Sequence, residues 1–253
     1  MLAMTSFSTT QNGRPIPILV YHQIAEAPAK GSPFRSLYVS PAAFARQMAW
    51  LARLGYTGLS MAGLMPYLEG KKMAKVVGIT FDDGYLNNLE HALPVLQKHQ
   101  FSSTCYAVSQ RLGQTNVWDF ELGIAQTALM NADQIRQWVA GGQDIGSHTR
   151  HHASLPALPL DAAAFEIRGA KAELEQVLQS PVRHFCYPYG HYEANHAAMA
   201  QSSGYATATT TGRGRCLRGA NPMELPRVPV VRSTSLIQFW LKVASGYEDR
   251  RRV

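Results

Sequence analysis

Short apolar runs alternate with helical patterns along most of the chain. Seven runs are rich in apolar and β-branched residues and have the length of buried strands: Pro17–His22, Lys75–Phe81, Ser103–Val108, Gln143–Ser147, Val182–Tyr187, Tyr205–Thr209 and Arg227–Val231. Six other segments carry apolar residues at helical spacing: Pro41–Leu54, Leu86–Gln100, Ala132–Ala140, Asp161–Leu178, Glu193–Ser203 and Leu236–Ala244. Such alternation of strands and helices is typical of parallel βαβ units.

The clearest helix signal begins at residue 41. Ser40 is a suitable N-cap, Pro41 suits the first helical position, and Gly55 follows the last apolar residue of the pattern. Pro94 lies in the middle of Leu86–Gln100, where it lacks the backbone N–H that a helix needs. We therefore expect a kink or a break in that helix.

Seven strands favour a barrel of the TIM type, complete or incomplete, over an open doubly wound sheet. The Gly-rich GxGxxG pattern of dinucleotide-binding sheets follows none of the early strands. No repeat, low-complexity segment or linker divides the chain. We therefore predict one α/β domain, whose chemistry should lie where strands end and βα loops begin.

The composition is that of a globular protein without a membrane-spanning helix. Hydrophobic residues make up 46% and charged residues 16% of the 253 residues, which excludes a disordered chain. No apolar run reaches the ~18 residues of a spanning helix, and the first residues lack the pattern of a secretory signal. Cys105, Cys186 and Cys216 are too few and too far apart for a disulfide framework. We expect a cytoplasmic location.

Most of the net positive charge lies in the last part of the chain. The net charge is +7, and residues 211–253 hold nine Lys or Arg against three Asp or Glu. A solvated basic rim or tail is the favoured interpretation, and peripheral association with anionic surfaces is the alternative. No nucleic-acid partner is expected, because aromatic residues do not alternate with the basic ones and no binding motif is present.

The first candidate site is a pair of aspartates at a strand end. The sequence ITFDDGY places Asp82, Asp83 and Gly84 directly after an apolar strand. On a regular strand their side chains would point to opposite faces, but next to a flexible glycine both carboxylates can face one pocket. Because adjacent carboxylates repel, that pocket needs a cation or a shared proton. Alternatively, both residues cap the helix that begins near Leu86.

The second candidate is a histidine cluster that follows another strand. The sequence GSHTRHHASL places His148 and His152 four residues apart, on one side of a helical turn or tight loop. His151 is offset from this pair, so we expect it behind the site or on the surface. Two imidazoles and one carboxylate of the aspartate pair would make a three-ligand metal site with open positions.

Two more strand ends carry candidate groups. Pro188 and Gly190 fix a turn in FCYPYG that can aim a backbone N–H into a cavity as an oxyanion donor, although a simple turn explains them equally well. His22 ends the first strand, where a histidine is more often structural than catalytic.

In this order, the motifs TFDDG, HTRHH and PYG resemble those of the polysaccharide deacetylase (NodB-homology) family. The resemblance covers residues 17–231 and implies a distorted (β/α)7-type barrel. We place one catalytic domain at 16–246, between a flexible N-terminal tail, 1–15, and a basic C-terminal tail, 247–253.

The resemblance also implies a role for each candidate residue. Asp82 would be the general base, and the backbone N–H of Tyr189 would face the oxyanion. Tyr85 and Pro188, which lie within the motifs, would contact the substrate. The ligands of a divalent metal, with zinc expected, would be Asp83, His148 and His152.

Two positions depart from the family pattern. Cys186 stands where the third motif usually has an arginine that orients the catalytic aspartate. Without another cation in its place, Asp82 would lack an ion pair and the lower-pH limb of activity would lie higher. The Leu-x-His that supplies the general acid in many members is also missing from residues 211–253.

Both departures resemble the poly-N-acetylglucosamine deacetylase branch, as does the segment Glu224–Val228. In that branch an early-strand histidine corresponds to His22, which we therefore predict to be the general acid. Its ordinary pKa of about 6.5 suits a proton donor near neutral pH.

The sequence thus predicts a metal-dependent hydrolase that removes N-acetyl groups from a GlcNAc-containing glycan and releases acetate. One alternative is a hydrolase of a linear or cyclic non-sugar C–N bond, and another is a non-catalytic carbohydrate-binding protein on the same scaffold. Aromatic side chains in the cleft would favour a sugar, whereas an arginine pocket closing over a small anion would favour the non-sugar bond.

Overall fold

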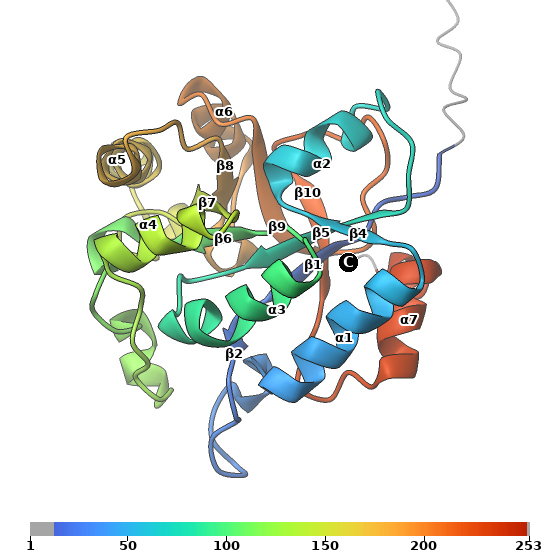
Figure 1. Ribbon diagram of the computed structural model, residues 1–253. Helices are drawn as coiled ribbons and strands as arrows, with labels where there is room; N and C mark the ends of the chain where they lie inside the picture. Colours follow the sequence, from blue (N-terminus) through green and yellow to red (C-terminus); the bar gives the residue numbers. More distant parts are fainter. Residues whose placement is uncertain (1–12, 252–253) are drawn as a thin grey trace, which may run out of the picture.

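Seven parallel strands close into a barrel with helices around it in the computed structural model, which describes residues 13–251 (Figure 1). They pair in the order β1-β10-β9-β8-β7-β6-β5, and β1 also pairs with β5, which closes the barrel. The strands are β1 (Ile18–Tyr21), β5 (Val76–Phe81), β6 (Thr104–Ala107), β7 (Asp144–Ser147), β8 (His184–Cys186), β9 (Thr207–Arg213) and β10 (Leu225–Pro229). The predicted single-domain (β/α)7 barrel is confirmed.

The helices cover the outside of the barrel (Figure 1). They are α1 (Pro41–Arg53), α2 (Met61–Leu68), α3 (Leu93–Lys98), α4 (Ala132–Ala140), α5 (Leu160–Leu178), α6 (Ala194–Ser202) and α7 (Leu236–Ala244). Ser40 caps α1 as predicted, because its side chain accepts a hydrogen bond from Ala43 N at 3.3 Å. The predicted break near Pro94 is also present: a π-helical turn, Asn88–Ala92, precedes α3.

Two short strands and one strand–helix unit lie beside the barrel. β2 (Gln23–Ile24) pairs with β3 (Tyr38–Val39), and β4 (Thr57–Leu59) pairs with the first half of β5. The sequence analysis missed β4 and α2, whose pattern is interrupted by Gly58 and Pro66. Gly58 is required by packing, since a Cβ atom there would lie 2.5 Å from the Ile79 side chain.

An aromatic cluster joins the barrel wall to the helices. Tyr21 of β1 and Phe81 of β5 stack at 5.6 Å, and Phe44 of α1 and Trp138 of α4 pack against them. Burial of each such ring contributes roughly 1.5–3 kcal/mol. The strands that lead to His22 and Asp82 are therefore anchored in the hydrophobic core.

The chain ends are described only in part. The predicted N-terminal tail lies outside the described residues up to residue 12, and residues 252–253 also lie outside them. Within the predicted C-terminal tail, Glu248 is fully buried and pairs with Lys242 and Arg213. This part of the predicted tail therefore packs against the barrel. No helix of the described chain has the length and apolar character needed to cross a bilayer.

Candidate functional site

Four strand ends bring the predicted site residues to one mouth of the barrel. His22 follows β1, Asp82 and Asp83 follow β5, His148 follows β7, and the turn at 188–190 follows β8. Because all barrel strands are parallel, these carboxyl ends lie at the same end of the barrel. The side chains of the first four residues line a cavity of about 370 Å³.

Asp82 forms a buried ion pair with Arg227 of β10. Two parallel hydrogen bonds join them, at 2.6 Å from Nη1 to Oδ1 and 2.7 Å from Nη2 to Oδ2. The guanidinium also donates to Thr80 Oγ1 at 3.2 Å and to the Thr210 carbonyl oxygen at 2.9 Å. Burial alone would raise the pKa of Asp82, but the charge and hydrogen bonds of Arg227 outweigh it and lower the pKa.

Another cation therefore takes the place of the family arginine, so the condition under which Asp82 would lack an ion pair is not met. Arg227 supplies the cation from a different strand and also donates to Cys186 Sγ at 3.2 Å. The β9–β10 pairing shifts register between Leu225 and Arg227, and such bulges redirect side chains near functional sites. Sequence analysis placed Arg227 in a strand but missed that its side chain is only 1% exposed.

Asp83 faces two imidazoles. Its Oδ1 lies 3.4 Å from His148 Nε2 and 3.3 Å from His152 Nε2, and all three side chains are buried. Asp83 has a φ of 73°, which turns the backbone at the end of β5 and separates its carboxylate from that of Asp82. Burial would raise the pKa of Asp83, but hydrogen bonds from His148 and His152 lower it well below its ordinary range.

This group of side chains fits a divalent metal ion. His148 Nδ1 lies 2.8 Å from the Cys186 carbonyl oxygen, which can only accept, so Nδ1 carries a proton and Nε2 is the nitrogen that would bind a metal once it is deprotonated. Burial lowers the pKa of His152, which favours the neutral ring that binds metal. Two imidazoles and one carboxylate leave a further coordination position for water or substrate.

The histidine segment is a loop without a helical turn. Thr149 and His152 have φ values of 64° and 61°, in the left-handed region. Glu166 of α5 holds this loop, since its Oε2 accepts from the backbone N–H groups of Arg150 and His151, each at 2.9 Å. Its Oε1 lies 2.6 Å from His151 Nδ1. His151 therefore lies behind the metal ligands, as expected.

His22 lies at the rim of the cavity beside Asp82. Its Nε2 is 4.0 Å from Asp82 Oδ2, and 27% of its side chain is exposed. The π-helical turn fixes its backbone, because Asn88 Nδ2 donates to the His22 carbonyl oxygen at 2.8 Å. The adjacent Asn87 and Asn88 side chains also accept hydrogen bonds from Ile24 N, each at 3.2 Å.

The turn that contains Tyr189 is hydrogen-bonded to β9. Tyr189 has a left-handed φ of 58°, and its carbonyl oxygen accepts a hydrogen bond from Thr211 Oγ1 at 3.2 Å. A Cβ atom at Gly190 would lie 1.9 Å from the same Oγ1, so the turn requires glycine.

Tyr85 lines the cavity as predicted for a substrate contact, whereas Pro188 is buried and does not line it.

Aromatic side chains form a large part of the cavity wall. Trp118 stacks on His152 at 4.5 Å and 17°, and Tyr189 packs edge-on against the same ring at 4.6 Å. No Arg or Lys lines the cavity within the described chain. Sequence analysis missed Trp118 and Asp119, since their segment has no periodic pattern that would place it over the site. The aromatic lining residues are Phe34, Tyr38, Tyr85, Trp118, Tyr187 and Tyr189.

The chain is similar in sequence to known proteins. The family model described as "Polysaccharide deacetylase" matches residues 69–208. The chain is 29% identical over 223 residues to YxkH of Bacillus subtilis, which covers 87% of this chain and 73% of that protein. It is 23% identical over 217 residues to a poly-β-1,6-N-acetyl-D-glucosamine N-deacetylase of Staphylococcus epidermidis, covering 82% and 72%.

A solved structure shows the same fold. The Streptococcus pyogenes deacetylase PplD, determined in complex with acetate, matches with a TM-score of 0.79. The two chains are 24% identical, and the match covers 90% of this chain and 98% of that one. The likeness therefore includes the whole barrel.

Proposed function

Since the chain belongs to the polysaccharide deacetylase family, we propose that it is a metal-dependent hydrolase that removes N-acetyl groups from a GlcNAc-containing glycan. One observation carries the proposal: a buried Asp–His–His group and a separately held aspartate share one cavity. The relative from Staphylococcus epidermidis, whose name specifies an N-deacetylase of poly-GlcNAc, supports this bond and this sugar.

In this proposal Asp83, His148 and His152 hold the metal, and zinc suits this donor set best. When bound, such an ion polarises the acetamide carbonyl and lowers the pKa of water. Asp83 contributes the negative charge of the ligand set. The His148 hydrogen bond to the Cys186 carbonyl oxygen holds a proton on Nδ1 and orients the ring so that Nε2 faces the metal position.

Asp82 is the general base. Arg227 lowers its pKa, so the carboxylate is ionised at neutral pH and can accept a proton. Each carboxylate oxygen uses one lone pair for Arg227 and keeps another for water. Asp82 takes the proton from the attacking water as the new C–O bond forms at the acetyl carbon.

Tyr189 acts on the carbonyl oxygen of the acetamide group, and His22 acts on its nitrogen. The Tyr189 backbone N–H stabilises the negative charge that develops on the carbonyl oxygen. An amide nitrogen is too poor a leaving group to depart unprotonated, so His22 donates a proton to it. The C–N bond then breaks and yields acetate and a free amino sugar.

The aromatic wall favours a sugar over the alternatives. Sugar rings pack their C–H faces against aromatic side chains, and Tyr85 and Tyr189 offer such surfaces beside the ligand group. A small anionic substrate would instead need a cation in the cavity, and the described lining has none. The presence of both aspartates and both histidines argues against a purely binding role.

Acetate release tests the proposal directly. Purified protein is incubated with N-acetylated glycans, including β-1,6-linked GlcNAc oligomers, with and without a chelator. We expect acetate release that the chelator abolishes and added zinc restores. Glycan binding without acetate release would support a carbohydrate-binding protein. Hydrolysis of a non-sugar amide or of a cyclic C–N bond, detected by analysis of its own product and without acetate release from any glycan, would support the other hydrolase.

A further inference from the structure

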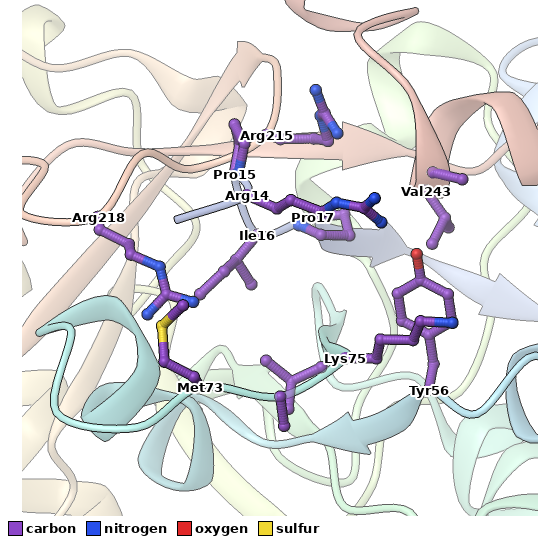
Figure 2. A pocket seen from close by; sticks show the side chains of 13 residues that line it. Arg14, Pro15, Ile16, Pro17, Tyr56, Met73, Lys75, Arg215, Arg218 and Val243 are labelled. Carbon is purple, nitrogen blue, oxygen red and sulfur yellow. The ribbon is translucent and has the colours of Figure 1, made fainter. Parts of the chain in front are cut away.

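A second cavity lies at the opposite end of the barrel. Its volume is about 400 Å³, and Pro17 and Val76 in its wall stand where β1 and β5 begin (Figure 2). The proposed catalytic residues follow the carboxyl ends of the same two strands. Because β5 has six residues, about 17–20 Å separate the two sites.

Four cationic side chains from separate parts of the chain line this cavity. Arg14 precedes β1, Lys75 precedes β5, and Arg215 and Arg218 lie in the connection from β9 to β10. The described lining contains no Asp or Glu. Like charges gathered around one hollow repel one another, so the arrangement favours an anion between them.

Protein carboxylates neutralise only part of this charge. Asp249 pairs with Arg215 at 2.7 Å. Arg218 Nη1 instead donates to the carbonyl oxygens of Tyr67 and Lys72, at 2.9 and 3.0 Å.

The two exposed cations have no carboxylate partner. Within residues 13–251, no carboxylate lies within 4.0 Å of Arg14 or Lys75, and Lys75 Nζ has only the Leu54 carbonyl oxygen at 3.4 Å and the nearby Tyr56 ring. They are therefore available to an external anion.

The rest of the wall is apolar and carries one hydroxyl group. Ile16, Met73 and Val243 line the cavity, and Tyr56 extends into it. In Figure 2, Arg14 and Lys75 extend toward Tyr56 on one side, and Arg218 lies next to Met73 on the other. A ligand that fits has a compact anionic head and a less polar body.

We propose that this cavity binds a phosphate ester, separately from the deacetylation site. Guanidinium groups match phosphate oxygens in bidentate geometry, and a lysine adds a point charge. The phosphate can belong to a free phosphorylated molecule or to a lipid headgroup, because both present the same anionic head. The basic C-terminal region thus contributes Arg215 and Arg218 to the wall of this cavity.

Calorimetry with pyrophosphate and sedimentation with vesicles test the proposal. The vesicles contain phosphatidylcholine with or without phosphatidylglycerol, and all measurements use the full chain at about 0.15 M salt to screen weak surface attraction. The variant Arg14→Ala/Lys75→Ala removes the two unpaired cations. Lys98→Ala/Arg168→Ala is the control, since both residues are exposed on α3 and α5, outside the cavity lining.

We expect saturable binding that weakens by at least about 10-fold in the cavity variant and less than about 2-fold in the control. Asp83→Ala should bind equally well, which separates this site from the proposed metal. Binding to pyrophosphate identifies a free phosphate ligand, and binding to anionic vesicles alone identifies a lipid headgroup. No saturable binding to either probe, or equal weakening in both variants, overturns the proposal.

Discussion

The two halves of the catalytic cleft treat two neighbouring aspartates in opposite ways. Asp82 and Asp83 are adjacent in sequence and almost equally buried, at 4% and 6% exposure. Asp82 pairs with a guanidinium, whereas Asp83 faces two imidazole nitrogens. Solvent exposure therefore does not distinguish them; their partners do.

The difference in partners sets the charge of each half. The Asp82–Arg227 pair is neutral as it stands and holds its carboxylate ionised. When His148 and His152 are both neutral, as metal ligands must be, Asp83 leaves one negative charge in a buried place, which a bound cation would balance. One half is therefore complete within the protein, and the other half is suited to receive a metal.

Asp83→Ala should have the largest effect, because it removes the carboxylate of the half that is suited to a metal. We expect bound metal to fall from about one per chain to near zero and kcat/KM to fall by at least about 10⁴-fold, because the anionic ligand and the chemistry of the metal are both lost. Elemental analysis of purified protein measures the metal, with His152→Ala as a second ligand variant. Full metal content in both variants would show that the ligand assignment is wrong.

Asp82→Asn should affect the other half without removing the metal. The amide cannot accept the proton from water, so we expect kcat to fall about 10³-fold while metal content stays near that of the unmodified protein. Circular dichroism checks the fold, because Arg227 loses its buried partner. Equal metal loss in Asp82→Asn and Asp83→Asn would contradict the division of roles.

His22→Ala should slow the step in which the amide nitrogen is protonated and leaves. We expect folded, metal-loaded protein with an about 10²-fold lower rate on an amide. An activated aryl acetate, whose leaving group needs no proton, should lose less than about 5-fold. Equal losses on the amide and on the ester would show that His22 is not the acid.

Arg227→Lys should give the smallest effect, a shift in pH dependence. Lysine keeps the charge but loses the two-pronged hydrogen bonding, so burial raises the pKa of Asp82 toward its ordinary range. Since the base must be ionised, the acid limb of kcat/KM should move to higher pH. Arg213→Lys is the control, because Arg213 pairs with Glu248 away from the cavity.

An unchanged acid limb in folded, active Arg227→Lys would contradict this account of Asp82. Cys186→Arg, which would restore the family arginine, is not expected to lower the limb further. The Arg227 guanidinium already lies 3.2 Å from Cys186 Sγ and occupies the space beside the aspartate.

Those parts of the fold and site that depend on local sequence could be predicted. Strand–helix alternation indicated the barrel, and the positions of Asp83, His148 and His152 at strand ends indicated that they converge. The reason given for the two histidines was incomplete, because they meet through left-handed backbone at Thr149 and His152 rather than through a helical turn.

Long-range partners could not be predicted in this way. Arg227 lies 145 residues from Asp82, and an arginine in a short strand gives no local sign of facing inward. The β-bulge beside it comes from the pairing of β9 with β10, which the sequence pattern of either strand does not reveal. Trp118 was missed for a similar reason, since its loop reaches His152 only through the tertiary fold.

The closure of the barrel by β10 has a consequence for biosynthesis. β1 can pair with β5 as soon as both have left the ribosome, but Arg227 emerges 145 residues after Asp82. At typical translation rates this interval is roughly 7–30 s. Throughout it the nascent chain carries the aspartate without its guanidinium and two barrel edges without their last strand. The cleft is thus completed only after Arg227 has emerged, and the unpaired edges are exposed to chaperones until then.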